Sequence, residues 1–405
     1  MWNSLHVTVL PAVLLNYVPA NEKNTWLGLL TFLGLILAML IQPLSGTLSD
    51  RWGSRIGRRR PFVIFGTAGD LIFLAILGFA GGLPALFIGY IGLQITSNIA
   101  QGPLQGLMPD IVPAEQLGTA SGIKTFSDMI GTVIASVLMG FLITSQNANP
   151  ARAVTAIIAL LVVVSLITIL SSHERPAPGI QIPSVNFKSL WRSAFNFKME
   201  GDRNYWKLIL SRFLYLFGVY GFQSFAQYLI RDKFPTQQPI ALTQLVMGVF
   251  VVVLIIFSLL AGVLGDRVGR KKVQILASIL GSIGAVLLIF AVTPAQLIGL
   301  STFLAAGLGM FLATNWALAN EMAPSAEAGK YMGLTNLATA GSAALARLEG
   351  PLIDGLNNAV PGSWMGWTAL FILSAVLMIA SAWVVQKVKI PHHRSQTKEA
   401  APSQG

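Results

Sequence analysis

The sequence predicts an all-α integral membrane protein with twelve transmembrane helices in two pseudo-symmetric six-helix bundles. The first observation is composition: 54% of the 405 residues are hydrophobic and only 11% are Asp, Glu, Lys or Arg, whereas a soluble protein carries about 25% charged residues. The second is the recurrence of mainly apolar stretches of the roughly 20 residues that span a bilayer. The third is that matching loops occur in both halves of the chain. A soluble globule is therefore excluded.

Windows of that length locate twelve segments, and one polar interval divides them six and six. The first half holds 1–19, 26–46, 61–80, 84–108, 119–143 and 151–170, and the second holds 205–230, 243–265, 273–292, 294–319, 331–356 and 364–385. We expect an N-terminal bundle over 1–171, a cytoplasmic linker over 172–204, a C-terminal bundle over 205–386 and a disordered tail over 387–405. The amphipathic second part of the linker either lies on the inner leaflet or packs on the bundle ends.

Basic residues concentrate on one side of the predicted membrane topology. The loop after the second segment and the loop after the eighth are rich in Arg and Lys, while the other side has only Lys23, Arg152, Arg231 and Lys233. The positive-inside rule makes the rich side cytoplasmic, with both termini there and the chain in the plasma (inner) membrane. The net charge of +11 is thus a topology signal, and no nucleic-acid partner is expected. The chain has no Cys and therefore no thiolate metal site, and without a Walker A loop it is not expected to use ATP. We expect no metal and no cofactor. We also expect a monomer.

The two halves resemble each other in sequence. Leu107, Asp110, Pro113, Gly118 and Gly122 align, at one constant offset, with Leu318, Glu321, Pro324, Gly329 and Gly333. This indicates a duplicated six-helix unit, an architecture in which two bundles rock around a midplane site. The same offset places Met1 opposite a residue inside the seventh segment. The first helix is therefore expected to lack a turn or two, either because the start codon is misplaced or because the chain is naturally short.

Two loop motifs occupy matching places in the halves, one at 46–53 and one at 262–271. They resemble the cytoplasmic loop signature of the major facilitator superfamily, which implies a transporter that works by alternating access. Glycines permit the tight turn, and a carboxylate at the membrane edge can pair with a basic side chain or a helix N-terminus. The alternative is that these residues only set topology and turns. The gating candidates are Gly46, Asp50, Arg51, Gly53, Arg55, Gly262, Asp266, Arg267, Gly269 and Arg270.

A narrower resemblance lies in the first half. The run from Ser49 to Pro61, and Asn98-Ile-Ala-Gln101-Gly-Pro103 followed by Asp110, are similar to the sucrose–proton symporters and their glycoside-transporting relatives. Two positions differ: Gln94 stands where that group has an acidic residue, and Gln105 stands where it has an arginine. In the family these charges serve proton coupling and substrate binding.

Ionisable side chains inside a membrane span are functional candidates because they are expensive there. Lys124 and Asp128 are spaced i, i+4 and can pair, as a proton-coupling switch or as a structural bridge. Glu349 and Asp70 are further coupling candidates. Arg347 is a candidate for binding an anionic or hydroxyl-rich substrate. Arg212 is expected to snorkel to the cytoplasmic interface.

Amides and other polar side chains recur on the predicted helices. Each amide can donate and accept, which suits a hydroxyl-rich ligand, although a single amide more often joins two helices. The substrate-binding candidates are His6, Gln94, Asn98, Gln101, Gln223, Gln227, Asn315, Trp316, Asn336 and Arg347. Trp316 could stack on a sugar ring or simply pack.

The resulting hypothesis is a secondary active transporter that moves a small-molecule substrate, a sugar or glycoside with proton coupling, and is not an enzyme. One alternative is proton-coupled efflux of lipophilic or cationic compounds. The other is a non-transporting sensor with the same fold.

Overall fold

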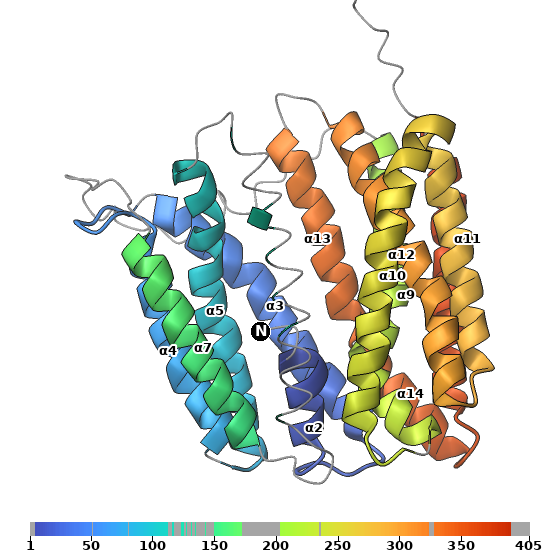
Figure 1. Cartoon of the computed structure of the whole chain (residues 1–405), viewed down its shortest axis with the longest axis horizontal. Helices are drawn as coiled ribbons and strands as arrows, with labels where there is room; N and C mark the ends of the chain where they lie inside the picture. Colours follow the sequence, from blue (N-terminus) through green and yellow to red (C-terminus); the bar gives the residue numbers. More distant parts are fainter. Residues whose placement is uncertain are drawn as a thin grey trace, which may run out of the picture.

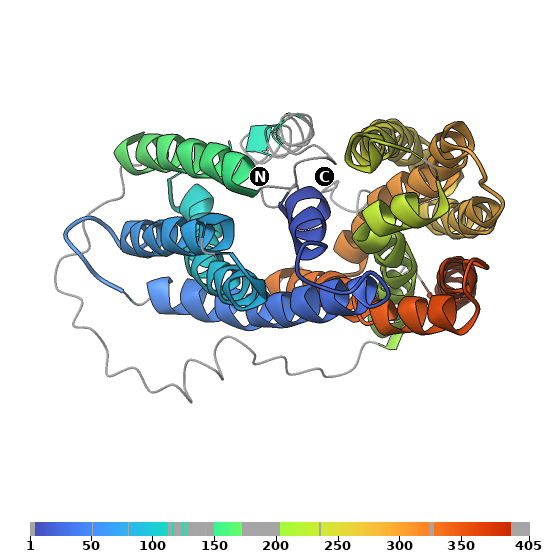
Figure 2. The same cartoon turned by 90° about the horizontal axis from the view of Figure 1, so that it is seen from below.

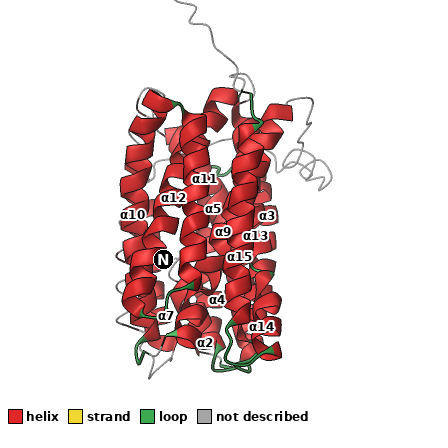
Figure 3. Ribbon diagram, turned by 90° about the vertical axis from the view of Figure 1, so that its right-hand side faces the viewer, coloured by secondary structure: helices red, strands yellow, loops and turns green. Residues whose placement is uncertain are grey.

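The computed structural model describes residues 5–50, 52–79, 81–111, 150–171, 203–234, 236–323 and 328–389, together with a few isolated positions between 116 and 142. Every element in this part of the chain is a helix (Figure 1). The helices run side by side, as the view in Figure 3 shows. The predicted linker, the predicted tail beyond 389 and most of the span predicted over 119–143 lie outside the described residues.

The described helices follow the predicted spans closely. The first half contains a π-helical turn, η1 (Leu5–Val9), and the helices α2 (Leu10–Leu14), α3 (Lys23–Asp50), α4 (Arg60–Phe79), α5 (Leu83–Ile111) and α7 (Pro150–Ser171). The second half contains α9 (Arg203–Lys233), α10 (Pro239–Val268), α11 (Arg270–Ile289), α12 (Pro294–Met322), α13 (Ala328–Ala346), α14 (Glu349–Ala359) and α15 (Met365–Gln386). Within the described residues, nine of these are long and apolar enough to cross a membrane.

The predicted span over 331–356 is wrong as a single helix, because the chain breaks between α13 and α14. Pro351 lacks a backbone N–H, and its ring would clash with the carbonyl four residues earlier, which is that of Arg347. That carbonyl accepts instead from the Gly350 amide, at 3.3 Å. The first segment also ends earlier than predicted, at Leu14 rather than residue 19.

Burial separates central helices from peripheral ones. The most apolar stretches of α9 and α12 are 61% buried, whereas those of α7 and α10 are 17% buried although their hydropathy is higher. A helix that is apolar all round is expected where its outer surface meets lipid. Most side chains of α7 and α10 therefore lie on the outer surface of the helix bundle, where lipid is expected, and α9 and α12 form the interior of the second half.

The two halves meet along α3. Within the first half, α5 packs against α3 and α4, and α7 packs against α4. Within the second half, α12 packs against α10 and α11, while α9 packs against α13 and α15. Between the halves, α3 contacts α13 and α14. Figure 2 views the two groups of helices from the end where α2 and α14 lie.

Two glycines permit the close approach of α3 to the helix break. A Cβ at Gly28 would lie 2.1 Å from the Arg347 carbonyl oxygen, and a Cβ at Gly350 would lie 2.2 Å from the Asn24 carbonyl oxygen. Because backbone, not a flexible side chain, occupies both places, no larger residue fits without moving a helix. The junction between the halves is thus backbone against backbone.

We expect Gly350→Ala to destabilise the protein, because its methyl group would overlap the Asn24 carbonyl. Overpacking of this kind costs about 1–3 kcal/mol, so the melting temperature of the purified protein in detergent should fall measurably. Gly355→Ala is the matched control on the same helix, since a Cβ there meets nothing within 4 Å. Equal melting temperatures for the two variants would contradict the close approach.

Candidate functional site

The molecule has two chemically different ends. The motif end carries the two loop motifs, around Asp50 and Asp266. The contact end carries the start of α3 together with α14, at the bottom of Figure 1. At the contact end, side chains from one half bind groups of the other half. At the motif end, every polar contact found within the described part of the chain joins residues of the same half.

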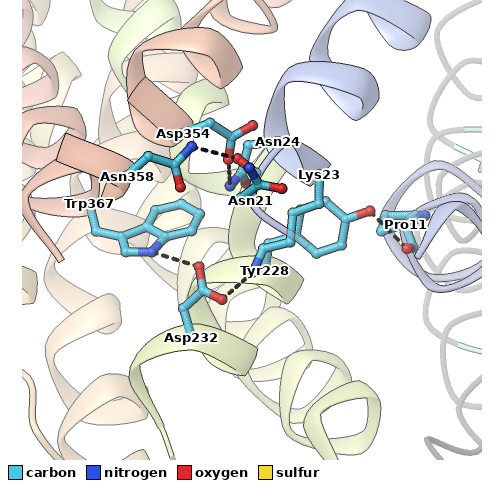
Figure 4. A network of polar contacts seen from close by, with 9 residues as sticks. All are labelled: Pro11, Asn21, Lys23, Asn24, Tyr228, Asp232, Asp354, Asn358 and Trp367. Atoms are coloured by element: carbon cyan, nitrogen blue, oxygen red, sulfur yellow. Dashed lines mark hydrogen bonds and ion pairs between the residues drawn. The ribbon is translucent and has the colours of Figure 1, made fainter. Parts of the chain in front are cut away.

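The Asp354 carboxylate joins the halves at the contact end (Figure 4). It lies on α14, is buried, and accepts from the Asn24 side-chain amide at 2.7 Å, the Thr25 backbone N–H at 2.7 Å and the Thr25 hydroxyl at 2.8 Å. The Thr25 amide belongs to the first turn of α3, where the backbone N–H groups have no partner within the helix. A carboxylate of one half thus caps a helix of the other, which the positive end of the helix dipole favours.

A second carboxylate strengthens the same end. Asp232, at the end of α9, forms an ion pair with Lys23 and accepts from the Trp367 indole N–H at 3.1 Å. The side chains of Lys23 and Asp232 are each only 11% exposed, so water screens the pair weakly. The Lys23 ammonium also lies 5.7 Å from the centre of the Tyr228 ring.

Three further hydrogen bonds cross between the halves. The Tyr228 hydroxyl donates to the Pro11 carbonyl at 2.9 Å, and the Asn358 amide donates to the Asn21 carbonyl at 2.9 Å. The Gln244 amide donates to the Thr8 hydroxyl. We call all these contacts the latch.

A central polar cluster lies beside the latch. From the first half, the Gln94 amide nitrogen is 2.8 Å from His6 Nε2 and donates to the Tyr90 hydroxyl at 2.8 Å. The rings of His6 and Tyr90 meet edge to face with centroids 5.5 Å apart. Gln94, which stands where the sucrose symporters have an acid, thus holds two aromatic side chains in place.

The second half supplies charge to the cluster. The Arg347 guanidinium donates to the Ser224 hydroxyl and interacts electrostatically with His6 and Tyr90. Glu349 is buried, and neither of its carboxyl oxygens has a hydrogen-bond partner among the described residues. It packs where a Cβ on Gly221 of α9 would otherwise lie. An ionised carboxylate without donors is expensive in such a place, whereas a protonated one is not.

At the motif end, the predicted gating residues pair within their own halves. Asp50 forms a 2.7 Å ion pair with Arg59, which also donates to Ser49 at 2.9 Å. Arg270 bonds Asp266 and Glu321, each at 3.2 Å. Gly269, at a φ of 103°, makes the turn between α10 and α11 that only glycine adopts readily. Arg51 lies outside the described residues, and Arg55, Arg267 and Gly262 are exposed.

The other coupling candidates are not brought together. Asp70 is buried between α4 and α5 and accepts from the Thr96 hydroxyl at 2.5 Å, within the first half. Asp128 lies outside the described residues, so its predicted pairing with Lys124 stays a prediction.

The amide candidates differ widely in their surroundings. Asn98 donates to the Gln94 carbonyl at 2.7 Å, and Gln227 is buried with both amide atoms unpartnered among the described residues. Gln223 is half-buried, while Gln101 and Asn336 are exposed. No group of three His, Asp or Glu side chains in the described part of the chain could hold a metal ion.

The expectation that Arg212 snorkels to the interface is wrong. It is 2% exposed and donates to Thr339 and Asn315 at 2.8 and 2.7 Å. Its guanidinium carbon lies 4.6 Å from the centre of the Trp316 ring. These contacts hold the Arg212 side chain inside the second half, away from the membrane interface.

Sequence reasoning missed the latch. Asp354 lies within the predicted span over 331–356, so the rule that intramembrane charges are costly could have found it. Asp232 sits between Arg231 and Lys233 and has the pattern of an ordinary loop charge. Its burial against Trp367 has no signal in the local sequence.

Comparison with known proteins identifies similar sequences. A family model described as the Major Facilitator Superfamily matches residues 3–234 and again residues 208–404. Solute carrier family 45 member 4 of Mus musculus is 30% identical over 148 residues, which are 33% of this chain and 19% of that protein. Sucrose transport protein SUC4 of Arabidopsis thaliana is 26% identical over 129 residues, 27% of this chain and 25% of that protein. The matched segments thus span a quarter or less of these curated relatives.

Solved structures match over nearly the whole chain. A D-xylose–proton symporter superposes with a TM-score of 0.74 at 17% identity, covering 96% of this chain and 94% of that one. A bacterial homologue of the human lysosomal transporter Spinster superposes with a TM-score of 0.69 at 16% identity, covering 95% and 93%. At such identities the likeness shows the fold.

We expect Asp354→Ala to loosen the contact end, because it removes three hydrogen bonds to a charged acceptor, each worth about 1.5–3 kcal/mol. The chain has no Cys, so spin labels on Ala20→Cys and Val360→Cys report the separation of the halves directly. In the variant, the measured distances should shift to larger values.

Asp266→Ala is the control, because the ion pair of Asp266 in the described part of the chain is with Arg270 of its own half, at the motif end. An unchanged distance distribution in Asp354→Ala, or an equal shift in Asp266→Ala, would argue against the latch.

Proposed function

Because the chain belongs to the major facilitator superfamily, a family of multi-pass membrane transporters, we propose that it moves a sugar or glycoside by alternating access, coupled to protons. One observation carries the proposal. The described polar contacts between the halves gather at the contact end, beside a polar cluster to which both halves contribute. A binding site closed on one side by breakable contacts is what alternating access needs.

The composition of the cluster supports a hydroxyl-rich substrate. Gln94, Tyr90, Ser224 and Arg347 offer donors and acceptors, and the unpartnered amide of Gln227 offers both. Two of the proteins similar to this chain, a sucrose transport protein and a D-xylose–proton symporter, point to the same class of substrate. The hypothesis of a sugar substrate rests on the composition of the central polar cluster and on these similarities together.

Glu349 is the carboxyl group best suited to carry a proton. Its buried oxygens lack donors within the described residues, so a proton taken up in one state would be released when the site opens to water. Arg347 interacts with it electrostatically. Substrate at Arg347 and a proton at Glu349 would then influence each other's binding.

The distribution of basic residues supports the orientation. With the motif end in the cytoplasm, both termini are cytoplasmic, the latch faces the exterior, and the arrangement of the halves is inward-facing. The chain would act as a monomer in the plasma (inner) membrane, because each monomer of this fold holds its own site between its halves.

The proposal is tested by disaccharide uptake into proteoliposomes with an acidic exterior. We expect accumulation above the external concentration in the wild type. Glu349→Gln cannot take up the proton, so it should equilibrate the sugar without accumulating it. Glu22→Gln is the control, because Glu22 is an exposed carboxylate bonded only to Trp26 among the described residues.

Other outcomes are equally informative. Accumulation that survives Glu349→Gln would remove that residue from coupling. Uptake that only equilibrates in the wild type would make the protein a facilitator. No uptake at all would contradict the hypothesis of a sugar substrate and would favour efflux of lipophilic or cationic compounds.

A further inference from the structure

A second cluster of the C-terminal half holds a buried cation without a counter-charge. Arg212 lies inside α9 and is 2% exposed. Its contacts are with the Thr339 hydroxyl, the Asn315 side-chain oxygen and the Trp316 ring, all of them neutral. A buried guanidinium is ordinarily paired with a carboxylate because an unpaired buried charge is costly. In the described part of the chain, no carboxylate contacts this one.

The cluster also has donors that lack an acceptor. Arg212 uses Nε and Nη1 in its two hydrogen bonds, and Nη2 has no acceptor among the described residues. Asn315 uses its oxygen to accept from Arg212, so its NH2 group remains, and that group is buried and unpartnered among the described residues. Two side chains that are hydrogen-bonded to each other, one of them charged, thus each keep a donor group without an acceptor in the described part of the chain.

The geometry points to an anion. We propose that Arg212 and Asn315 bind the carboxylate or phosphate of an acidic sugar, with Trp316 beside the sugar ring. The inference rests on the proposed function and narrows its substrate class from sugars to acidic sugars. Guanidinium and amide N–H groups match the paired oxygens of such anions. Trp316 is half-buried and one face of its ring lies against the Arg212 guanidinium, so the opposite face is the one on which a sugar ring would pack.

The position of the cluster agrees with a path through the C-terminal half. Asn315 and Trp316 are on α12, Thr339 is on α13 and Arg212 is on α9. The anion site and the central polar cluster share α9, which carries Arg212 in the first and Ser224, the acceptor of Arg347, in the second. A single substrate moving between them would keep a cation close throughout.

The test is binding to the full-length protein in detergent without added phospholipid, measured by calorimetry with D-glucuronate, D-glucose 6-phosphate, D-glucose and inorganic phosphate. We expect at least one acidic sugar to bind tenfold or more tightly than D-glucose, and the comparison of the two acids distinguishes carboxylate from phosphate. Arg212→Gln should abolish this preference, and Arg212→Lys should retain part of it. Arg203→Gln, the same change at an exposed position of α9, should leave it intact.

A second variant distinguishes loss of the anion site from a folding defect, which Arg212→Gln alone could also cause. Asn315→Asp places a carboxylate of the same shape on the guanidinium, so it should raise the melting temperature and at the same time abolish binding of the acidic sugar. Persistence of acid binding in Asn315→Asp would overturn the site.

The proposal also fails if D-glucose binds as tightly as both acids, if Arg212→Gln retains the preference, or if inorganic phosphate alone binds as tightly as the acidic sugars. In these cases disaccharide uptake can still establish the proposed function. Absence of both sugar binding and sugar uptake would overturn both.

Discussion

The carboxylate of Asp354 is the constraint around which the two halves are arranged. It is buried, and its three donors all come from the first turn of α3 in the other half. A buried carboxylate that loses its donors keeps the full cost of desolvation, so the halves cannot part at this end without water replacing them. The glycines at 28 and 350 follow from the same requirement, because the donors reach Asp354 only if the backbones touch.

The helix break at Pro351 connects this contact to the central polar cluster. It divides Arg347, at the end of one segment, from Glu349, at the start of α14, which also carries Asp354. A movement that tilts or shifts α14 relative to the rest of its own half would therefore displace Glu349 from Arg347 and from Gly221 on α9 at the same time as it moves Asp354. Because the latch carboxylate Asp354 and Glu349 lie on one short helix, the proposed proton coupling would have a direct physical route from opening to protonation.

Much of the fold could be predicted because its causes are local. A run of about 20 apolar residues specifies a span wherever it occurs, and α4, α12 and α15 lie within a few residues of their predicted bounds. The break was also encoded, since the Gly350-Pro351 pair removes a helix hydrogen bond. The pairing of Asp354 with Thr25 was not, because it depends on the register between two halves distant in sequence. The burial of Arg212 likewise depends on Asn315 and Thr339, which come from two other helices.

The two halves differ in how well their buried charged side chains are partnered. Among described residues of the first half, Asp70 and Arg59 are buried with hydrogen-bond partners in that half. Among the described residues, Glu349 of the second half has no hydrogen-bond partner and Arg212 has only neutral ones. Burying such groups costs desolvation energy, and an apolar side chain in their place would make the fold more stable. Their presence is therefore explained if a reversibly bound species offsets that cost. Under the proposed function, a proton at Glu349 and an anionic substrate group at Arg212 are the two species that would neutralise them, while Tyr90 and Gln94 of the N-terminal half contribute neutral hydrogen-bonding groups to the central polar cluster.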